Sequence, residues 1–139
     1  MKEVGIINRG LAKVISEQGH GDRLMVVDAG FAIPSDVEVI DISLKENSPV
    51  VMEVLEELKK FFSVEKIIMA VQTKEINPTL FNSVLKVWEN NIEVEVIEHA
   101  ELKKLAKDVK AVVRTGDFTA YGNVILVSGA GERWFCENK

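Results

Sequence analysis

The sequence predicts an α/β fold: a single-domain, three-layer α/β/α arrangement around a largely parallel or mixed sheet of about six strands. Short apolar segments of strand length alternate along the chain with amphipathic helical segments, which is typical of a sheet covered by helices on both faces. The length of 139 residues, with 47% hydrophobic and 28% charged residues, suits one ordinary globular domain. No internal repeat or linker divides the chain, so we expect one domain over residues 1–139.

The first expected helix covers residues 10–18, where apolar residues recur at the spacing of one helical face. Gly19 stands where a glycine in the left-handed conformation commonly ends a helix. His20 is therefore expected just beyond the end of this helix.

Two strands and a second helix are expected next. Leu24–Val27 is a continuous apolar run with the β-branched character of a buried strand, and Asp28 begins the turn that follows it. A short strand is expected at Val37–Ile40. Ser48 and Pro49 then suit the N-cap and first position of a helix, because serine and proline are favoured there.

The second half of the chain continues the alternation. Asn77 and Pro78 are expected to open a helix that ends near Asn90. The other expected elements are a strand at 66–71, a strand at 92–97, a helix at 99–108, and strands at 111–113 and 124–127 around a loop at 114–123. In folds of this class the loops at strand ends form the binding pocket.

Charge and cysteine content restrict the partners and the compartment. The chain has 22 acidic against 17 basic residues, a net charge of −5, and no basic stripe, so we expect no nucleic acid and no anionic membrane as partners. The single cysteine, Cys136, can form no intramolecular disulfide. Since no signal peptide and no apolar run of membrane-spanning length is apparent, we expect a cytoplasmic protein.

Several other chemistries find little support in the sequence. His20, Asp28 and His99 could together form a metal site, but no closely spaced ligand pair nominates a metal. Ser128–Gly131 is glycine-rich but precedes no helical segment, as a phosphate-binding loop would. Cys136 has no predicted basic pocket that would activate a thiol. We therefore expect neither a metal nor an organic cofactor.

The two histidines are the candidates for proton transfer. Histidine suits this chemistry because its ordinary pKa of about 6.5 leaves both protonation states accessible near neutral pH. Each has a simpler explanation as well. His20 would be favoured near the negative end of a helix dipole, and His99 could be an ordinary first-turn residue.

Other polar residues could hold a polyhydroxylated ligand. Asp28 could accept hydrogen bonds from sugar hydroxyls or orient a histidine, although it could equally cap its own turn. Tyr121, Gly122 and Asn123 together offer a phenol, close backbone approach and an amide. An ordinary turn between strands would explain the same tripeptide.

Five segments, in this order and spacing, resemble the D-ribose pyranase family over nearly the whole chain. They are Leu11–Ile15, Gly19-His20, Asp28–Gly30, Asp41–Leu44 and Ala111–Gly116. The resemblance implies a cofactor-free isomerase that equilibrates β-D-ribopyranose with β-D-ribofuranose. It also implies a homodecamer of two stacked pentameric rings, with active sites near the subunit contacts.

The same resemblance assigns roles to individual residues. The position of His20 is the family's proton donor. The residues at the family's substrate-binding positions are Asp28, His99, Tyr121, Gly122 and Asn123.

Two other functions stay open. At positions 21 and 122 the glycines of this chain resemble those of L-fucose mutarotases. The segment Asp28–Pro34 and His99 resemble instead the ribose branch of the family. The chain could therefore be a mutarotase for fucose or another monosaccharide, or a sugar-binding regulatory protein without turnover. Residues 131–139 extend past the usual end of the family and have no assigned role.

Overall fold

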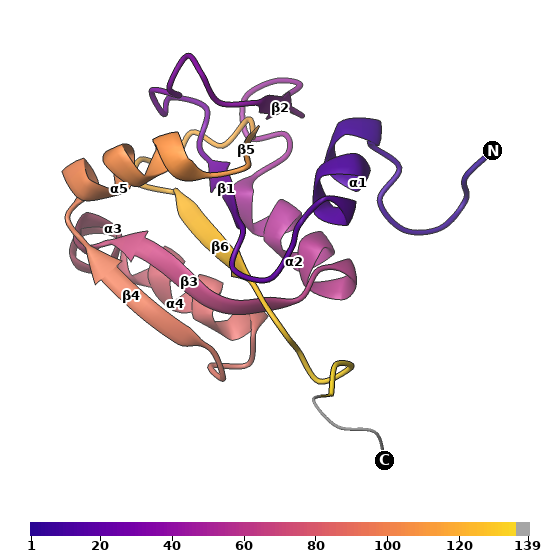
Figure 1. Cartoon of the computed structure of the whole chain (residues 1–139). Coiled ribbons are helices and arrows are strands. Elements are labelled where there is room, and N and C mark those ends of the chain that lie inside the picture. The colour runs from indigo at the N-terminus through magenta and orange to yellow at the C-terminus, as the bar shows by residue number, and fades with distance from the viewer. Residues whose placement is uncertain (136–139) are drawn as a thin grey trace.

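One mixed sheet of six strands organises the computed structural model, which describes residues 1–135 (Figure 1). The strands are β1 (Arg23–Val27), β2 (Val39–Asp41), β3 (Val64–Ala70), β4 (Glu93–Ile97), β5 (Ala111–Arg114) and β6 (Val124–Ser128). They lie in the order β2-β5-β1-β6-β3-β4. β6 is antiparallel to its neighbours β1 and β3, and the other pairs are parallel. The predicted α/β class with a mixed sheet is confirmed.

Helices cover both faces of this sheet. They are α1 (Arg9–Ser16), α2 (Val51–Phe61), α3 (Val71–Ile76), α4 (Pro78–Val87) and α5 (His99–Leu105), followed by the short 3₁₀ helix η1 (Ala106–Asp108). The apolar sides of α1, α2 and α4 share one hydrophobic core with the sheet, and α5, η1 and part of the segment 31–37 share the other. The expected three layers are therefore present.

β1 shows why the sequence of a strand in this sheet is a continuous apolar run. Leu24 and Val26 belong to the core under α1 and α2, whereas Met25 and Val27 belong to the core under α5. Successive side chains of a strand point to opposite faces, so a strand in a sheet covered on both sides needs apolar residues at every position. All four side chains are fully buried.

The first helix ends earlier than the sequence predicts. α1 stops at Ser16, and Gly19 does not adopt the left-handed conformation; Gly21 does, at φ +88°. The Gly19 amide instead donates to the Asp22 carboxylate at 2.7 Å. This side-chain contact closes the turn, so that the left-handed glycine lies two residues further along the chain.

The predicted start of the second helix is also wrong. α2 begins at Val51, beyond Ser48 and Pro49, and its own flanking residues provide no side-chain cap. The Asp117 carboxylate accepts a hydrogen bond from the Val51 amide at 2.9 Å. An acceptor supplied by a loop distant in sequence leaves no local signal for the helix start.

The remaining elements agree more closely with the expectations, with one omission. Asn77 caps α4 by accepting from the Leu80 amide at 3.0 Å, and Pro78 is the first helical residue. The sequence gives no sign of the short helix α3, which begins at Val71, a residue expected to lie in β3. α3 has no side-chain cap, so only its tertiary contacts identify it.

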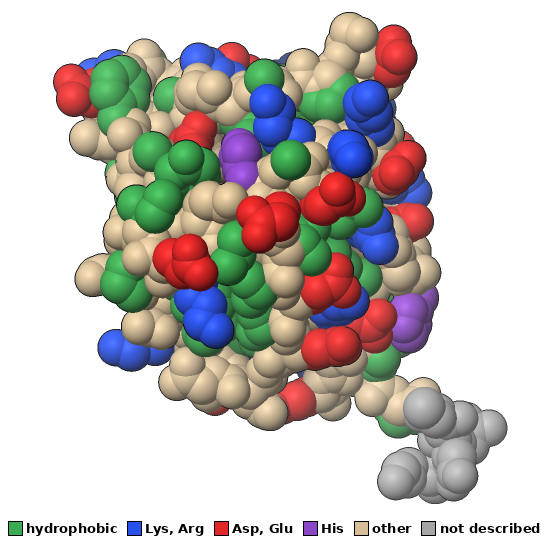
Figure 2. Space-filling view, turned by 90° about the vertical axis from the view of Figure 1, so that its left-hand side faces the viewer, with side chains coloured by type: hydrophobic (Ala, Val, Ile, Leu, Met, Phe, Trp, Pro, Cys, Tyr) green, Lys and Arg blue, Asp and Glu red, His purple; other side chains and the backbone are tan. Residues whose placement is uncertain are grey.

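The surface carries both signs of charge. Figure 2 shows the side of the molecule where α5, α3 and β4 lie, with acidic and basic side chains interspersed around apolar ones. This face has no continuous basic stripe of the kind that a nucleic acid would need. None of the helices within residues 1–135 is long and apolar enough to cross a membrane.

Candidate active site

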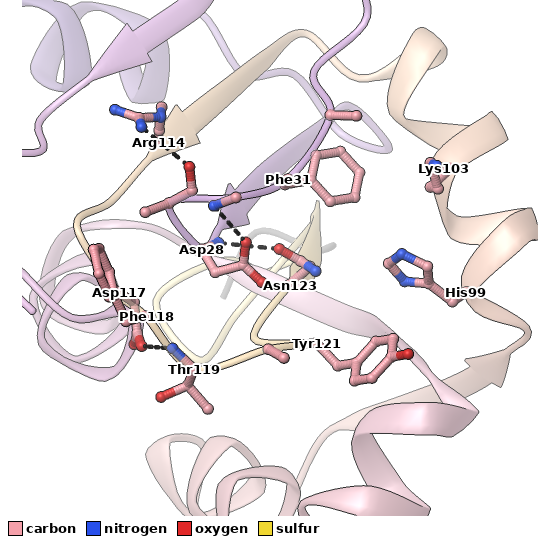
Figure 3. A pocket seen from close by; sticks show the side chains of 14 residues that line it. Asp28, Phe31, His99, Lys103, Arg114, Asp117, Phe118, Thr119, Tyr121 and Asn123 are labelled. Carbon is pink, nitrogen blue, oxygen red and sulfur yellow. Dashed lines mark hydrogen bonds between the residues drawn. The ribbon is translucent and has the colours of Figure 1, made fainter. Parts of the chain in front are cut away.

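A cavity of about 600 Å³ lies at the carboxyl ends of the parallel strands. Its walls come from residues 28–32 after β1, from the loop 114–123 between β5 and β6, and from His99 and Lys103 on α5 (Figure 3). Because β6 is antiparallel, the loop that precedes it returns to the same edge as the ends of β1 and β5. Sheets of this class bind small ligands at such an edge, and the volume suits a small molecule.

Asp28 is the central carboxylate of the cavity. It is buried, its amide donates to Asn123 Oδ1 at 3.0 Å, and its Oδ1 accepts from the Gly30 amide at 3.0 Å. Burial raises the pKa of Asp28, while hydrogen bonds from the Gly30 and Gly122 amides and from the Asn123 side chain act against that rise. The carboxylate is thus held in place with acceptor capacity available for ligand hydroxyls.

Asn123 and Gly122 complete the surroundings of Asp28. Asn123 is buried, and because Oδ1 is occupied by the Asp28 amide, its amide nitrogen is the group turned toward the His99 side in Figure 3. Gly122 does not line the cavity. A Cβ at Gly122 would lie 3.0 Å from the Thr119 carbonyl oxygen, so the backbone here leaves little room for a side chain.

His99 forms the opposite wall. Its ring packs edge-to-face against Tyr121, with centroids 5.2 Å apart, and against Phe31 at 6.2 Å. Burial lowers the pKa of His99, the positive charge of Lys103 lowers it further, and the negative charge of Asp28 partly compensates. Its Nδ1 is buried and has no hydrogen-bond partner within residues 1–135. A polar atom in that state on a cavity wall is suited to a ligand hydroxyl.

Tyr121 lies beside His99 in an unusual backbone conformation. Its φ is +59°, in the left-handed region that bulky residues rarely adopt. Its ring lies against His99 on the wall of the cavity (Figure 3). The structure therefore brings together Asp28, His99, Tyr121 and Asn123, with Gly122 behind Asp28.

His20 does not lie at this cavity within one chain. It precedes β1, while Asp28 follows β1, and the five residues of this strand, at about 3.3 Å each, span about 16 Å. Its Nε2 lies 3.1 Å from Glu65 Oε2, near the start of β3, and 68% of the side chain is exposed. His20 is thus at the opposite end of the sheet from the cavity.

Sequence reasoning missed several lining residues, among them Arg114, Lys103 and Phe118. Arg114 donates to the Ser43 hydroxyl at 2.8 Å and to the Ala29 carbonyl at 3.0 Å, which joins the end of β2 to the turn after β1. Arg114 directly follows an expected strand, and this position indicates a place at the cavity, because parallel strands end at the same edge of the sheet. Lys103 and Phe118 carry no such signal.

The sequence offered three other candidate sites, namely a metal site, the glycine-rich segment Ser128–Gly131 and Cys136. Since His20 lies far from Asp28 and His99, these three residues form no common metal site in one chain, and residues 1–135 contain no cluster of three metal-ligating side chains. β6 ends at Ser128, and no helix follows it within the described residues. Cys136 lies outside those residues.

Comparison with known proteins places the chain in a family. The model of the RbsD / FucU transport protein family matches residues 1–131. D-ribose pyranase of Streptococcus uberis is 44% identical over 129 residues, which are 93% of this chain and 98% of that protein. D-ribose pyranase of Kosmotoga olearia is 43% identical over 130 residues, with the same shares covered.

Solved structures agree with this placement. Bacillus subtilis RbsD complexed with D-ribose superimposes with a TM-score of 0.89 at 39% identity, covering 94% of this chain and 98% of that one. The fucose mutarotase of Streptococcus pneumoniae in complex with L-fucose has a TM-score of 0.80 at 20% identity, over 94% of this chain and 99% of that one, and so shares the fold. The chain belongs to the RbsD / FucU transport protein family.

Proposed function

We propose that this chain is a D-ribose pyranase, an isomerase that interconverts β-D-ribopyranose and β-D-ribofuranose, with residues 1–139 forming one domain. The observation that carries the proposal is the near full-length similarity to curated D-ribose pyranases at 43% and 44% identity. The similar structure that holds D-ribose is 39% identical, whereas the one that holds L-fucose is only 20% identical.

Ring opening and ring closure each need two proton transfers. Opening the pyranose removes a proton from the anomeric hydroxyl, breaks the bond between C1 and the ring oxygen, and gives that oxygen a proton, which yields the aldehyde. Closure forms the bond from the C4 hydroxyl oxygen to C1, removes the proton from that hydroxyl and protonates the carbonyl oxygen. Groups that exchange protons near neutral pH accelerate both steps.

The cavity offers a donor and acceptor set for such a sugar. The Asp28 carboxylate accepts hydroxyl hydrogen bonds, the Asn123 amide and Tyr121 hydroxyl donate them, and His99 presents its imidazole on the cavity wall. Because burial lowers the pKa of His99, its ring is neutral at neutral pH and its free nitrogen can accept. The rings of Phe31 and Tyr121 supply apolar surface for the sugar carbons.

We assign the proton-donor role to His20 acting in the cavity of a neighbouring copy. Within its own chain the length of β1, about 16 Å, lies between His20 and Asp28, too far for a hydrogen bond, yet 68% of the His20 side chain is free to meet another molecule. A closed homo-oligomer, here a decamer of two stacked pentameric rings in the cytoplasm, would supply that neighbour. Glu65 would hold the imidazole toward it through the 3.1 Å contact.

Magnetisation-transfer NMR on equilibrated sugars tests the activity. Catalytic amounts of the protein should accelerate exchange between the pyranose and furanose forms of D-ribose. Acceleration confined to the anomers of L-fucose would reassign the substrate, in the direction that Gly21 and Gly122 favour. Binding of sugar without faster exchange would identify a regulatory protein instead.

A complementation experiment tests the shared site. His20→Ala and Asp28→Ala chains should each be deficient, and co-expressed mixtures should regain exchange, because some sites then combine His20 of one copy with Asp28 of another. A chain with both substitutions, mixed with either single variant, is the matched control. Mixtures no more active than their separate components, with the assembly intact, would contradict the proposal.

A further inference from the structure

α3 lies just outside the cavity and contacts two of its walls. It begins at Val71, directly after the carboxyl end of β3, and neither Gln72 nor Thr73 lines the cavity. Their side chains nevertheless reach His99 on one side and Tyr121 on the other. Two adjacent residues thus connect segments that are more than 20 positions apart in the sequence.

Gln72 holds the start of α5. Its Oε1 accepts a hydrogen bond from the His99 amide at 2.9 Å, and its Nε2 donates to the Glu98 carboxylate at 2.9 Å. Since the two ends of the amide differ in hydrogen-bonding character, this pair of bonds permits only one orientation of the side chain. The flanking residue of α5 provides no side-chain cap of its own, so Gln72 supplies it.

Thr73 holds the backbone of Tyr121. Its side chain is buried, at 1% exposure, and its hydroxyl donates to the Tyr121 carbonyl at 2.6 Å. Tyr121 has the unfavourable φ of +59°, and a conformation of this kind persists where surrounding contacts enforce it. The Thr73 hydroxyl is such a contact.

α5 packs on the sheet through the fully buried Leu102, but its hydrogen bonding to the rest of the cavity is indirect. The turn after β1 and the loop 114–123 bond directly to each other, through Asp28 to Asn123 and Ala29 to Asp117. Among residues 1–135, α5 makes no hydrogen bond to either of them. The relative position of the His99 and Tyr121 rings therefore depends on α3 as well as on the packing of α5 against the sheet.

We propose that Gln72 and Thr73 are positioning residues for the isomerase site, which hold His99 and Tyr121 in the arrangement that binds sugar. The inference rests on the proposed function, since it assigns sugar binding to those two side chains. Neither positioning residue touches the sugar. Both act through the geometry of the residues that do.

Kinetic measurements on matched variants test this assignment. Thr73→Val keeps the shape of the side chain and removes the hydroxyl, and should raise the KM for ribose about fivefold, the typical worth of one hydrogen bond, with kcat nearly unchanged. Thr73→Ser should restore the wild-type KM. Thr79→Val makes the same chemical change at an exposed position of α4 and should alter nothing.

Gln72→Leu provides a second, independent variant with a spectroscopic readout. In protein labelled with ¹³Cε1-histidine, the His99 signal and its titration should shift in Gln72→Leu and Thr73→Val. The His99 signal of Thr79→Val, which should stay in place, is the reference. A purely structural role would lower the Tm and leave the His99 signal unmoved.

The outcomes separate the two proposals. A wild-type protein that does not exchange ribose refutes the function. A wild-type protein that does, together with variants of wild-type KM and an unchanged His99 signal, refutes the positioning role alone.

Discussion

The two ends of the sheet differ in the burial of their polar side chains. At the carboxyl end of β1, Asp28 and Asn123 are buried and bonded to each other's segments, and His99 keeps an unpartnered buried nitrogen. At the amino end, His20 and Asp22 lie at the surface, His20 in contact with Glu65 and Asp22 in an ion pair with Lys110. Burial of polar groups is costly and is therefore concentrated where a ligand binds, whereas exposed pairs contribute little to stability.

The difference also separates two roles in the proposed reaction. Residues of the carboxyl end would bind the sugar, and the exposed His20 would donate a proton to another copy. Substitutions at the two ends should therefore affect different kinetic constants.

The largest effect is expected at the amino end. His20→Ala should slow ribose exchange by about 10²–10⁴-fold, the usual contribution of a general acid or base, while sugar affinity changes far less. Magnetisation transfer at saturating ribose measures the rate, and calorimetric titration measures the affinity. A wild-type rate with the oligomer intact would show that His20 is only a surface residue. His99 would then be the next candidate for the proton donor.

Asp28→Ala should have the next largest effect, and on binding. Loss of a charged acceptor costs about 1.5–3 kcal/mol, so ribose affinity should fall by about 10- to 100-fold together with turnover. Calorimetric titration measures this loss. Asp36→Ala, at an exposed position, is the matched control and should bind normally. If Asp28→Ala binds ribose as the wild type does, the cavity is not the sugar site.

The pH dependence of stability should report the buried His99. Because its pKa is lower in the folded chain, the unfolded chain takes up the proton first as the pH falls. Stability should therefore decrease as the pH falls from about 6.5 toward the folded pKa of His99. His99→Gln should reduce this slope in urea titrations at several pH values. An equal slope in the variant would place the cause elsewhere.

Gly122→Ala should have the smallest effect. The added Cβ would meet the Thr119 carbonyl oxygen at 3.0 Å and Leu80 Cδ2 at 3.6 Å, so a small backbone shift should cost about 1 kcal/mol of stability. Urea denaturation measures this cost, and ribose exchange should persist. Complete loss of ribose binding in a folded variant would show that Gly122 approaches the sugar itself.

Local signals in the sequence account for most elements of the fold. Asn77 and Pro78 mark the start of α4 correctly, because the cap and the capped amide are neighbours in the chain. The start of α2 was mispredicted because its cap, Asp117, comes from a distant loop. The sequence does not predict α3, because this helix has no side-chain cap and is too short to show a clear helical periodicity of apolar residues.

The local patterns of the sequence predicted the fold class. The resemblance of its motifs supplied the family and the site residues Asp28, His99, Tyr121 and Asn123, which the structure gathers around one cavity, with Gly122 behind Asp28. Periodicity is a local feature and so predicts strands and helices, whereas the roles of these residues came from the resemblance. Only the tertiary structure decided that α3 joins His99 to Tyr121 and that His20 lies at the other end of the sheet. Those facts depend on strand order and on contacts between distant segments, which no local pattern of residues encodes.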